Sequence, residues 1–392
     1  MRKILAFVVA LCCVSTAMAQ YNPDIVSTDV SKIPTRSRQD IILPQVNGYN
    51  IYKGDFHIHT IYSDGSVTPE FRVLEAWLDG LDIIAITEHI EYRGVEPKMH
   101  EWMRNYNGGT PHESVNRNVI TKSADERGIM VDMQYSTNAA IKASKEHGIL
   151  VVPGAEITRE PVKIGHYNAL FTTDNNAIYD PDPLVSMRNA RSQGALIMHN
   201  HPGWRRTSVA KTEFEKQAYG EGLIDGVEVM NGGQFYPKVV DRAREENLFV
   251  SSNTDVHNTT ADAYRMKGLM RNMTFVFAKE CTLESVKEAF QSRRTLAFGG
   301  GQIAGDEQLL KDLFLASIDV KKLSKTRKGT NVMLTNKTSL TYYVRRGERG
   351  TLVPLRPFST MVYTVAKGNK IPLILESMWT GDHTHPKVVL TF

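Results

Sequence analysis

The chain has 392 residues, of which 41% are hydrophobic, and its 47 basic and 43 acidic residues give a formal net charge of +4. This near balance argues against a nucleic-acid-binding protein that relies on bulk charge. The hydrophobic share is that of an ordinary globular protein. No apolar stretch is long enough to span a bilayer, so no membrane span is expected.

Residues 1–19 predict a secretory signal peptide. Two basic residues precede an apolar run at 4–14, which is too short to cross a membrane, and Ala17-Met18-Ala19 fits a small-residue cleavage site. The protein is therefore expected to be exported, to the periplasm or the extracellular space. Residues 20–50 are polar and contain three prolines, which predicts an N-terminal arm.

Apolar runs and helical patterns alternate from residue 51 to about 300. The predicted strands are 51–57, 82–87, 149–153, 166–171, 195–199, 226–230, 248–252 and 273–277. Thr68-Pro69 is typical of a helix start, and Gly148 of a helix end. The alternation predicts an α/β fold with a parallel sheet wrapped by helices, closed into a TIM-like barrel. Such barrels place their chemistry at the carboxyl ends of the strands.

Residues 301–392 change character. A predicted helix at 306–315 is followed by short runs rich in valine, threonine and tyrosine, which predict a small β-sandwich-like domain. Gly299-Gly300-Gly301 is interpreted as a flexible linker between this domain and the barrel at 51–300.

Histidine and acidic residues gather at the predicted strand ends. His57 and His59 end the first strand, and side chains two residues apart on a strand point to the same side. The turn Ser63-Asp64-Gly65 brings a carboxylate back toward them. One histidine at a strand end is more often a hydrogen-bonded structural residue than a ligand. Six strand ends in succession instead indicate a metal site.

The composition of this set indicates the kind of metal. It contains no cysteine, and imidazole with carboxylate suits Zn, Fe or Mn. One catalytic zinc needs three protein ligands and a water, so nine candidates predict two or three divalent ions. The nine candidate ligands are His57, His59, Asp64, His89, Glu156, His166, His201, Asp255 and His257.

These motifs resemble those of the PHP family of phosphoesterases (polymerase and histidinol phosphatase domains). In order they are Asp-x-His-x-His-Thr-x-x-Ser-Asp-Gly from residue 55, Thr-Glu-His from 87, Gly-x-Glu from 154, His-Pro-Gly from 201 and Asp-x-His from 255. The resemblance covers about residues 52–300. It implies a distorted (β/α)7 barrel that holds a trinuclear Zn, Fe or Mn centre.

The resemblance also implies how the ligands divide among three ions. The first ion would be held by His57, His59, Glu156 and Asp255, the second by Glu156, His166 and His201, and the third by Asp64, His89 and His257. The residues of the third group are also expected to act in catalysis.

Clustered divalent ions lower the pKa of a bound water, so a metal-activated hydroxide is expected to attack a phosphoester. A small phosphorylated substrate is expected, and a phosphomonoester is favoured over a diester. The candidate substrate-binding residues are Arg205, Arg93, Arg159, Trp204, Asn231 and His199. Arg205 is preferred because it follows the His-Pro-Gly motif, although most arginines are solvated surface residues. The long connection at 90–147 is either a lid or a surface insertion.

Two alternatives stay open. An amidohydrolase-type barrel also uses His-x-His on its first strand, but it would want a carboxylated lysine where Glu156 stands. An inactive secreted protein that binds metal or glycan would be expected to lack several ligands, and none of the nine is missing.

Overall fold

The computed structural model describes residues 37–90, 132–159 and 162–392. The predicted signal peptide, Arg93 and most of the 90–147 connection lie outside the described residues. Residues Arg38–Phe392 form one compact unit. Within the described residues no helix is both long and apolar enough to cross a membrane.

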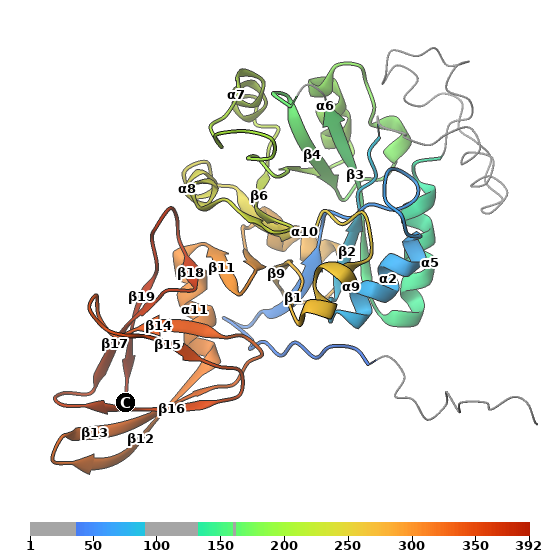
Figure 1. Ribbon diagram of the computed structural model, residues 1–392. Helices are drawn as coiled ribbons and strands as arrows, with labels where there is room; N and C mark the ends of the chain where they lie inside the picture. The colour runs from blue at the N-terminus through green and yellow to red at the C-terminus, as the bar shows by residue number, and fades with distance from the viewer. Residues whose placement is uncertain (1–36, 91–131, 160–161) are drawn as a thin grey trace, which may run out of the picture. The chain divides into compact units, whose positions relative to one another are not determined.

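A curled 12-stranded sheet dominates the described residues (Figure 1). Its strands are β1 (Asn50–Asp55), β2 (Ile83–Ile86), β3 (Leu150–Arg159), β4 (Gly165–Leu170), β5 (Leu196–His199), β6 (Gly226–Asn231), β7 (Gln234–Phe235), β8 (Phe249–Asn253), β9 (Met273–Ala278), β10 (Thr295–Gly299), β11 (Gln302–Gly305) and β18 (Met378–Trp379). The strand order is β18-β11-β10-β9-β1-β2-β3-β4-β5-β6-β7, and β8 pairs with β6. The predicted α/β class with a curled, barrel-like sheet is confirmed.

Helices pack against the strands of this sheet. The helices are α2 (Pro69–Leu78), α5 (Tyr135–His147), α6 (Pro183–Ser192), α7 (Glu213–Gly220), α8 (Pro237–Glu245), α9 (Thr260–Ala263), α10 (Leu283–Gln291) and α11 (Glu307–Ser317), with short 3₁₀ turns η2 (Asn175–Ala177) and η3 (Arg265–Lys267). The hydroxyl of Thr68 caps α2 by accepting from the backbone of Phe71. Gly148 ends α5 in a left-handed conformation with φ 65°.

The sheet is mixed rather than wholly parallel. The strands β1-β2-β3 and β5-β6-β8 run parallel, whereas β4 is antiparallel to both β3 and β5. Only residues 160–164 separate β3 from β4. That connection is too short for the crossover that a parallel neighbour needs, so the two strands form a hairpin.

The interpretation of Gly299-Gly300-Gly301 as a flexible linker is wrong. Strands β10 and β11 pair as an antiparallel hairpin, with Gly299 opposite Gln302. Gly300 and Gly301 form its turn with φ angles of 56° and 76°, which glycine adopts without a steric penalty.

The C-terminal residues form two small antiparallel sheets, as the predicted sandwich-like domain requires. The first contains β12 (Ile318–Thr326), β13 (Gly329–Asn336) and β16 (Thr360–Val365), and the second contains β14 (Tyr342–Arg345), β15 (Leu352–Leu355), β17 (Lys370–Leu375) and β19 (Lys387–Thr391). The strand β18 lies apart from both, because it pairs in parallel with β11 of the main sheet. One buried apolar cluster includes Phe275 of the main sheet and Phe314 of α11. The domain boundary at residue 300 stays a prediction.

Candidate metal centre

The predicted ligands come together at the ends of the main-sheet strands. His57 and His59 follow β1, His89 follows β2, and His201 follows β5. Glu156 lies on β3 and pairs through a bridge with His89. Because β4 runs antiparallel to β3, its first residues, including His166, start beside the end of β3.

Four groups of side chains have ligand atoms within 4.8 Å of one another. These groups are His59 with Asp64, His89 and His257; His57 with His201 and Asp255; His57 with His59 and Glu156; and Glu156 with His166 and His201. All nine predicted ligands occur in them, and the groups share members as a multinuclear site requires. The division among individual ions stays a prediction.

Glu156 lies at the centre of the cluster. Its Oε2 is 3.4 Å from Nε2 of His57, 3.3 Å from Nε2 of His59 and 2.8 Å from Nδ1 of His89. Its Oε1 is 3.4 Å from Nδ1 of His166. The carboxylate therefore faces imidazoles from several strand ends, and its predicted role as a ligand shared by two ions needs such a central position.

Two aspartates complete the cluster. Oδ1 of Asp255 is 3.2 Å from Nε2 of both His57 and His59. Oδ1 of Asp64 is 3.2 Å from Nε2 of His257, and its Oδ2 is 3.4 Å from Nε2 of His89. The turn that presents Asp64 needs glycine next to it, because a Cβ at Gly65 would lie 2.7 Å from the carbonyl carbon of His59.

Several of these atoms lack hydrogen-bond partners. Among the described residues, Nε2 of His57, Nε2 of His59, Oε2 of Glu156 and Nε2 of His166 are buried without one. Leaving a buried polar atom unpaired costs about 1–3 kcal/mol. Imidazole nitrogens and a carboxylate oxygen gathered in this way fit divalent cations, which would satisfy all of them.

The acidic and basic side chains of the cluster shift each other's pKa values. Burial alone would lower the pKa of His57, but Asp255, Glu228 and Glu156 raise it well above its usual value. Burial alone would raise the pKa of Glu156, but His89 and His57 hold it well below its usual range. The carboxylate of Glu156 is thus ionised while His57 carries a proton, and a bound cation would replace that proton.

Two candidate ligands have unusual backbone conformations. His201 has φ 25° and Asp255 has φ 53°, in the region that non-glycine residues rarely occupy. Each such residue costs about 1–3 kcal/mol and is typical of functional sites. Each residue lies just after a strand end, His201 after β5 and Asp255 after β8, and each belongs to the ligand groups.

Glu228 is a supporting residue that sequence reasoning did not place in the site. Its Oε1 accepts from Nδ1 of His57 at 2.9 Å, and its Oε2 accepts from the backbone N–H of His201 at 2.8 Å. The bond to Nδ1 orients the ring of His57 and leaves Nε2 for a metal. The sequence feature that could have indicated this role is an acidic residue within the mostly apolar strand β6.

Arg72 is a second missed residue. Its side chain is buried on α2, and its guanidinium donates to the carbonyl oxygens of His59 at 2.9 Å, Val256 at 3.0 Å, His257 at 2.9 Å and Asn258 at 2.7 Å. It thereby joins two chain segments that carry candidate ligands. The sequence gives no signal for this role.

The predicted substrate residues lie in different surroundings. The ring centre of Trp204 is 5.3 Å from the ring centre of His166. Arg205 is exposed, and its guanidinium carbon lies over the ring of Trp204, 4.3 Å from the ring centre. Asn231 donates to Glu228 at 2.9 Å and to Asp255 at 3.4 Å, so it supports the cluster. Arg159 ends β3, and the structure does not describe its side chain.

His199 does not belong to the cluster. It is fully buried, its Nδ1 is 2.9 Å from the hydroxyl of Tyr219, and its Nε2 is 3.2 Å from Oε1 of Glu215. These partners come from α7, outside the four ligand groups. Its ring lies beside buried side chains of α7, and the role of His199 in substrate binding stays a prediction.

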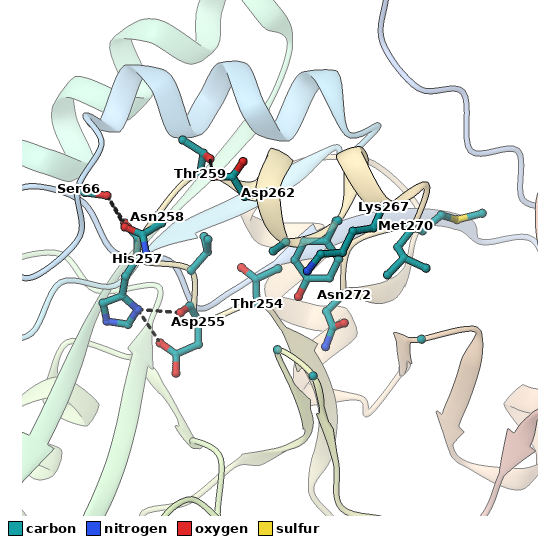
Figure 2. A pocket seen from close by; sticks show the side chains of 17 residues that line it. Ser66, Thr254, Asp255, His257, Asn258, Thr259, Asp262, Lys267, Met270 and Asn272 are labelled. Atoms are coloured by element: carbon teal, nitrogen blue, oxygen red, sulfur yellow. Dashed lines mark hydrogen bonds and ion pairs between the residues drawn. The ribbon is translucent and has the colours of Figure 1, made fainter.

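A cleft of about 860 Å³ opens beside the cluster (Figure 2). Asp255 and His257 belong to both, and the segment from Thr254 to Asn272 forms much of its lining. The cleft gives the cluster a route to solvent.

The chain matches the family model of the PHP domain over residues 55–261. It also resembles the crystal structure of a two-domain protein from Bacteroides vulgatus ATCC 8482 that contains a predicted PHP-like metal-dependent phosphoesterase. The two are 29% identical with a TM-score of 0.78, and the alignment covers 91% of this chain and 100% of that chain. No curated protein matches the chain.

Two solved structures are more distant. An amidohydrolase from Chromobacterium violaceum is 14% identical with a TM-score of 0.33, and the alignment covers 53% of this chain and 89% of that one. Endonuclease Q in complex with a 27-mer duplex is 17% identical with a TM-score of 0.40, with 65% and 60% covered.

Proposed function

Because the chain belongs to the PHP domain family, we propose that it hydrolyses a phosphoester with two or three divalent ions, Zn, Fe or Mn, in this cluster. A small phosphomonoester is the favoured substrate. The observation that carries the proposal is the set of unpaired buried ligand atoms around Glu156. When bound, the ions would lower the pKa of an attacking water and neutralise phosphoryl oxygens.

The protein's own residues have three tasks in this reaction. The nine ligands hold the charge at fixed positions, and Glu228 fixes the ring of His57. Burial of Glu156 and of most of the imidazoles keeps bulk water away from the centre, which strengthens electrostatic interactions there. The cleft admits substrate at the exposed edge.

We also propose that the protein is exported, on the basis of its N-terminal sequence.

The test combines metal content with turnover. Purified protein is reconstituted with Zn, Fe or Mn, metal per chain is measured, and phosphate or nitrophenol release is followed on nitrophenyl phosphate and bis-nitrophenyl phosphate. Two or three ions per chain are expected, with faster hydrolysis of the monoester. His59→Ala and Asp255→Ala should abolish turnover.

A matched control is Asp382→Ala, which removes an aspartate from a part of the chain remote in sequence from the cluster and should change neither metal content nor rate. Less than one ion per chain after reconstitution, with no release from either ester, would refute the proposal.

A further inference from the structure

The accessible edge of the metal centre faces the cleft. Most candidate ligands are buried, but the side chains of Asp64, Asp255 and His257 are 31%, 21% and 36% exposed. Two of these three line the cleft. A phosphoester that reaches the cluster from this edge must place its organic group there.

Three glycines in the lining add no side chains to the cleft. They are Gly232 and Gly233 from the turn between β6 and β7, and Gly300 from the turn between β10 and β11. No heavy atom lies within 4 Å of where a Cβ would stand on Gly233 or Gly300. The cleft volume of about 860 Å³ lies in the range of small-molecule sites.

Lys267 supplies positive charge at the far end of the cleft. Figure 2 shows Asp255 and His257 toward one end, and Lys267 with Met270 toward the other. Among the described lining residues Lys267 is the only lysine or arginine. The neighbouring Arg265 pairs with Asp79 at 3.2 Å, whereas no ion pair to Lys267 occurs in the described part of the chain.

Other polar groups of the lining already have partners. Thr254 donates to Asp55 at 2.5 Å, the Asn272 amide donates to the carbonyl of Asn253 at 3.3 Å, and Asp262 accepts from Thr259 at 3.0 Å. The ammonium of Lys267 is therefore the group best suited to meet a charge brought by a ligand.

We propose that this cleft binds the organic group of the phosphoester and that Lys267 pairs with a second anionic group of the substrate. The substrate would be an elongated phosphoester with its phosphoryl group at the Asp255 and His257 end and a carboxylate or second phosphate at the Lys267 end. The inference rests on the proposed function and adds the substrate class and a specificity-determining residue.

The test compares two substrates of equal length. 6-Phosphogluconate carries a carboxylate at the end opposite its phosphate, and sorbitol 6-phosphate carries a neutral hydroxymethyl group there. The wild-type protein should show the higher kcat/KM for 6-phosphogluconate. Lys267→Met should remove that preference, lowering kcat/KM for this substrate about three- to fivefold, through KM, as for a solvent-exposed ion pair.

Three comparisons isolate the charge. Lys267→Met should leave sorbitol 6-phosphate and nitrophenyl phosphate unchanged, Lys267→Arg should keep the preference, and Lys328→Met in the turn between β12 and β13 should behave as wild type. Metal content should be equal in all variants. Equal kcat/KM for the two six-carbon esters in the wild type, or an equal effect of Lys267→Met on both, would overturn the proposal.

A second variant tests the cleft without changing charge. Gly233→Phe should fill part of the cleft and raise KM for both six-carbon esters at least about tenfold, with metal content retained. Unchanged KM values would place the organic group elsewhere and overturn the inference. The nitrophenyl esters separate the proposed function from the cleft. No release from nitrophenyl phosphate or bis-nitrophenyl phosphate by the metal-loaded wild type refutes the proposed function, whereas release from either together with unchanged KM values refutes the cleft alone.

Discussion

Replacing Arg72 should loosen the metal centre without touching a ligand. Its guanidinium makes four hydrogen bonds to backbone carbonyls of the segments around His59 and His257, and a fifth to Glu75 at 2.8 Å. Arg72→Met has a similar length but no donor. It removes these hydrogen bonds and leaves the buried carboxylate of Glu75 without its ion-pair partner.

The expected loss in free energy of unfolding follows from the groups that lose their partner when Arg72 is replaced. Removing one partner of a buried ion pair costs about 3–5 kcal/mol, and each hydrogen bond lost to a backbone carbonyl adds to that cost. We expect Arg72→Met to lower the free energy of unfolding by about 4 kcal/mol. Arg72→Lys keeps the charge but offers three donors from a single nitrogen, which cannot span four carbonyls, so about half of that loss is expected.

The assay has two readouts. Urea unfolding of the metal-free protein reports stability, and metal per chain after dialysis reports how well the ligands are held. Arg188→Met is the control, because Arg188 makes an exposed ion pair with Glu221 at 2.6 Å and should cost at most about 1 kcal/mol. The reasoning would be refuted if Arg72→Met unfolded at the same urea concentration as this control and kept all its metal.

Three further predictions concern the cluster. Glu156→Gln should reduce bound metal to less than half of the wild-type amount, because an amide is a poor substitute for a bridging carboxylate; full loading measured by elemental analysis would contradict this. Glu228→Gln should weaken metal affinity about 10- to 100-fold by releasing the ring of His57, and competition with a fluorescent chelator checks it against wild type. Burial alone would lower the pKa of His89, but Glu156 and Asp64 raise it to about 10. His89 therefore carries a proton at pH 7.5, and metal uptake at that pH should release it. Metal affinity should also rise with pH up to about 10. Calorimetry in buffers of different ionisation enthalpy measures this release, and a heat independent of buffer would exclude it.

The strand-end ligands could be predicted because parallel strands bring their carboxyl ends to one edge. For β1, β2 and β8 the apolar run identifies the strand, and the histidine or acid that follows identifies the site. His199 and His201 show where this reasoning fails. The strand β5 ends at His199, so the alternation of a strand does not extend to His201. The φ of 25° at His201 turns the chain, so the two rings lie in different surroundings.

Supporting residues could not be predicted, because their partners are distant in sequence. Arg72 lies on a helix where an arginine is normally expected in solvent, and only the folded chain brings the carbonyls of residues 256–258 within its reach. Glu228 carried a weak signal as an acid inside an apolar strand. The antiparallel course of β4 was missed because apolar periodicity reports a strand but not its direction.

The pairing of β18 with β11 affects how the chain folds during its synthesis. The two strands are joined through Ile303 opposite Met378 and Ala304 opposite Trp379. During synthesis the backbone groups along this side of β11 have no partner until residues 378–379 leave the ribosome. An unpaired strand edge invites association with other chains. The C-terminal residues therefore act late in biogenesis as an intramolecular cover, and a nascent chain stalled before residue 378 should depend on chaperones to stay unaggregated.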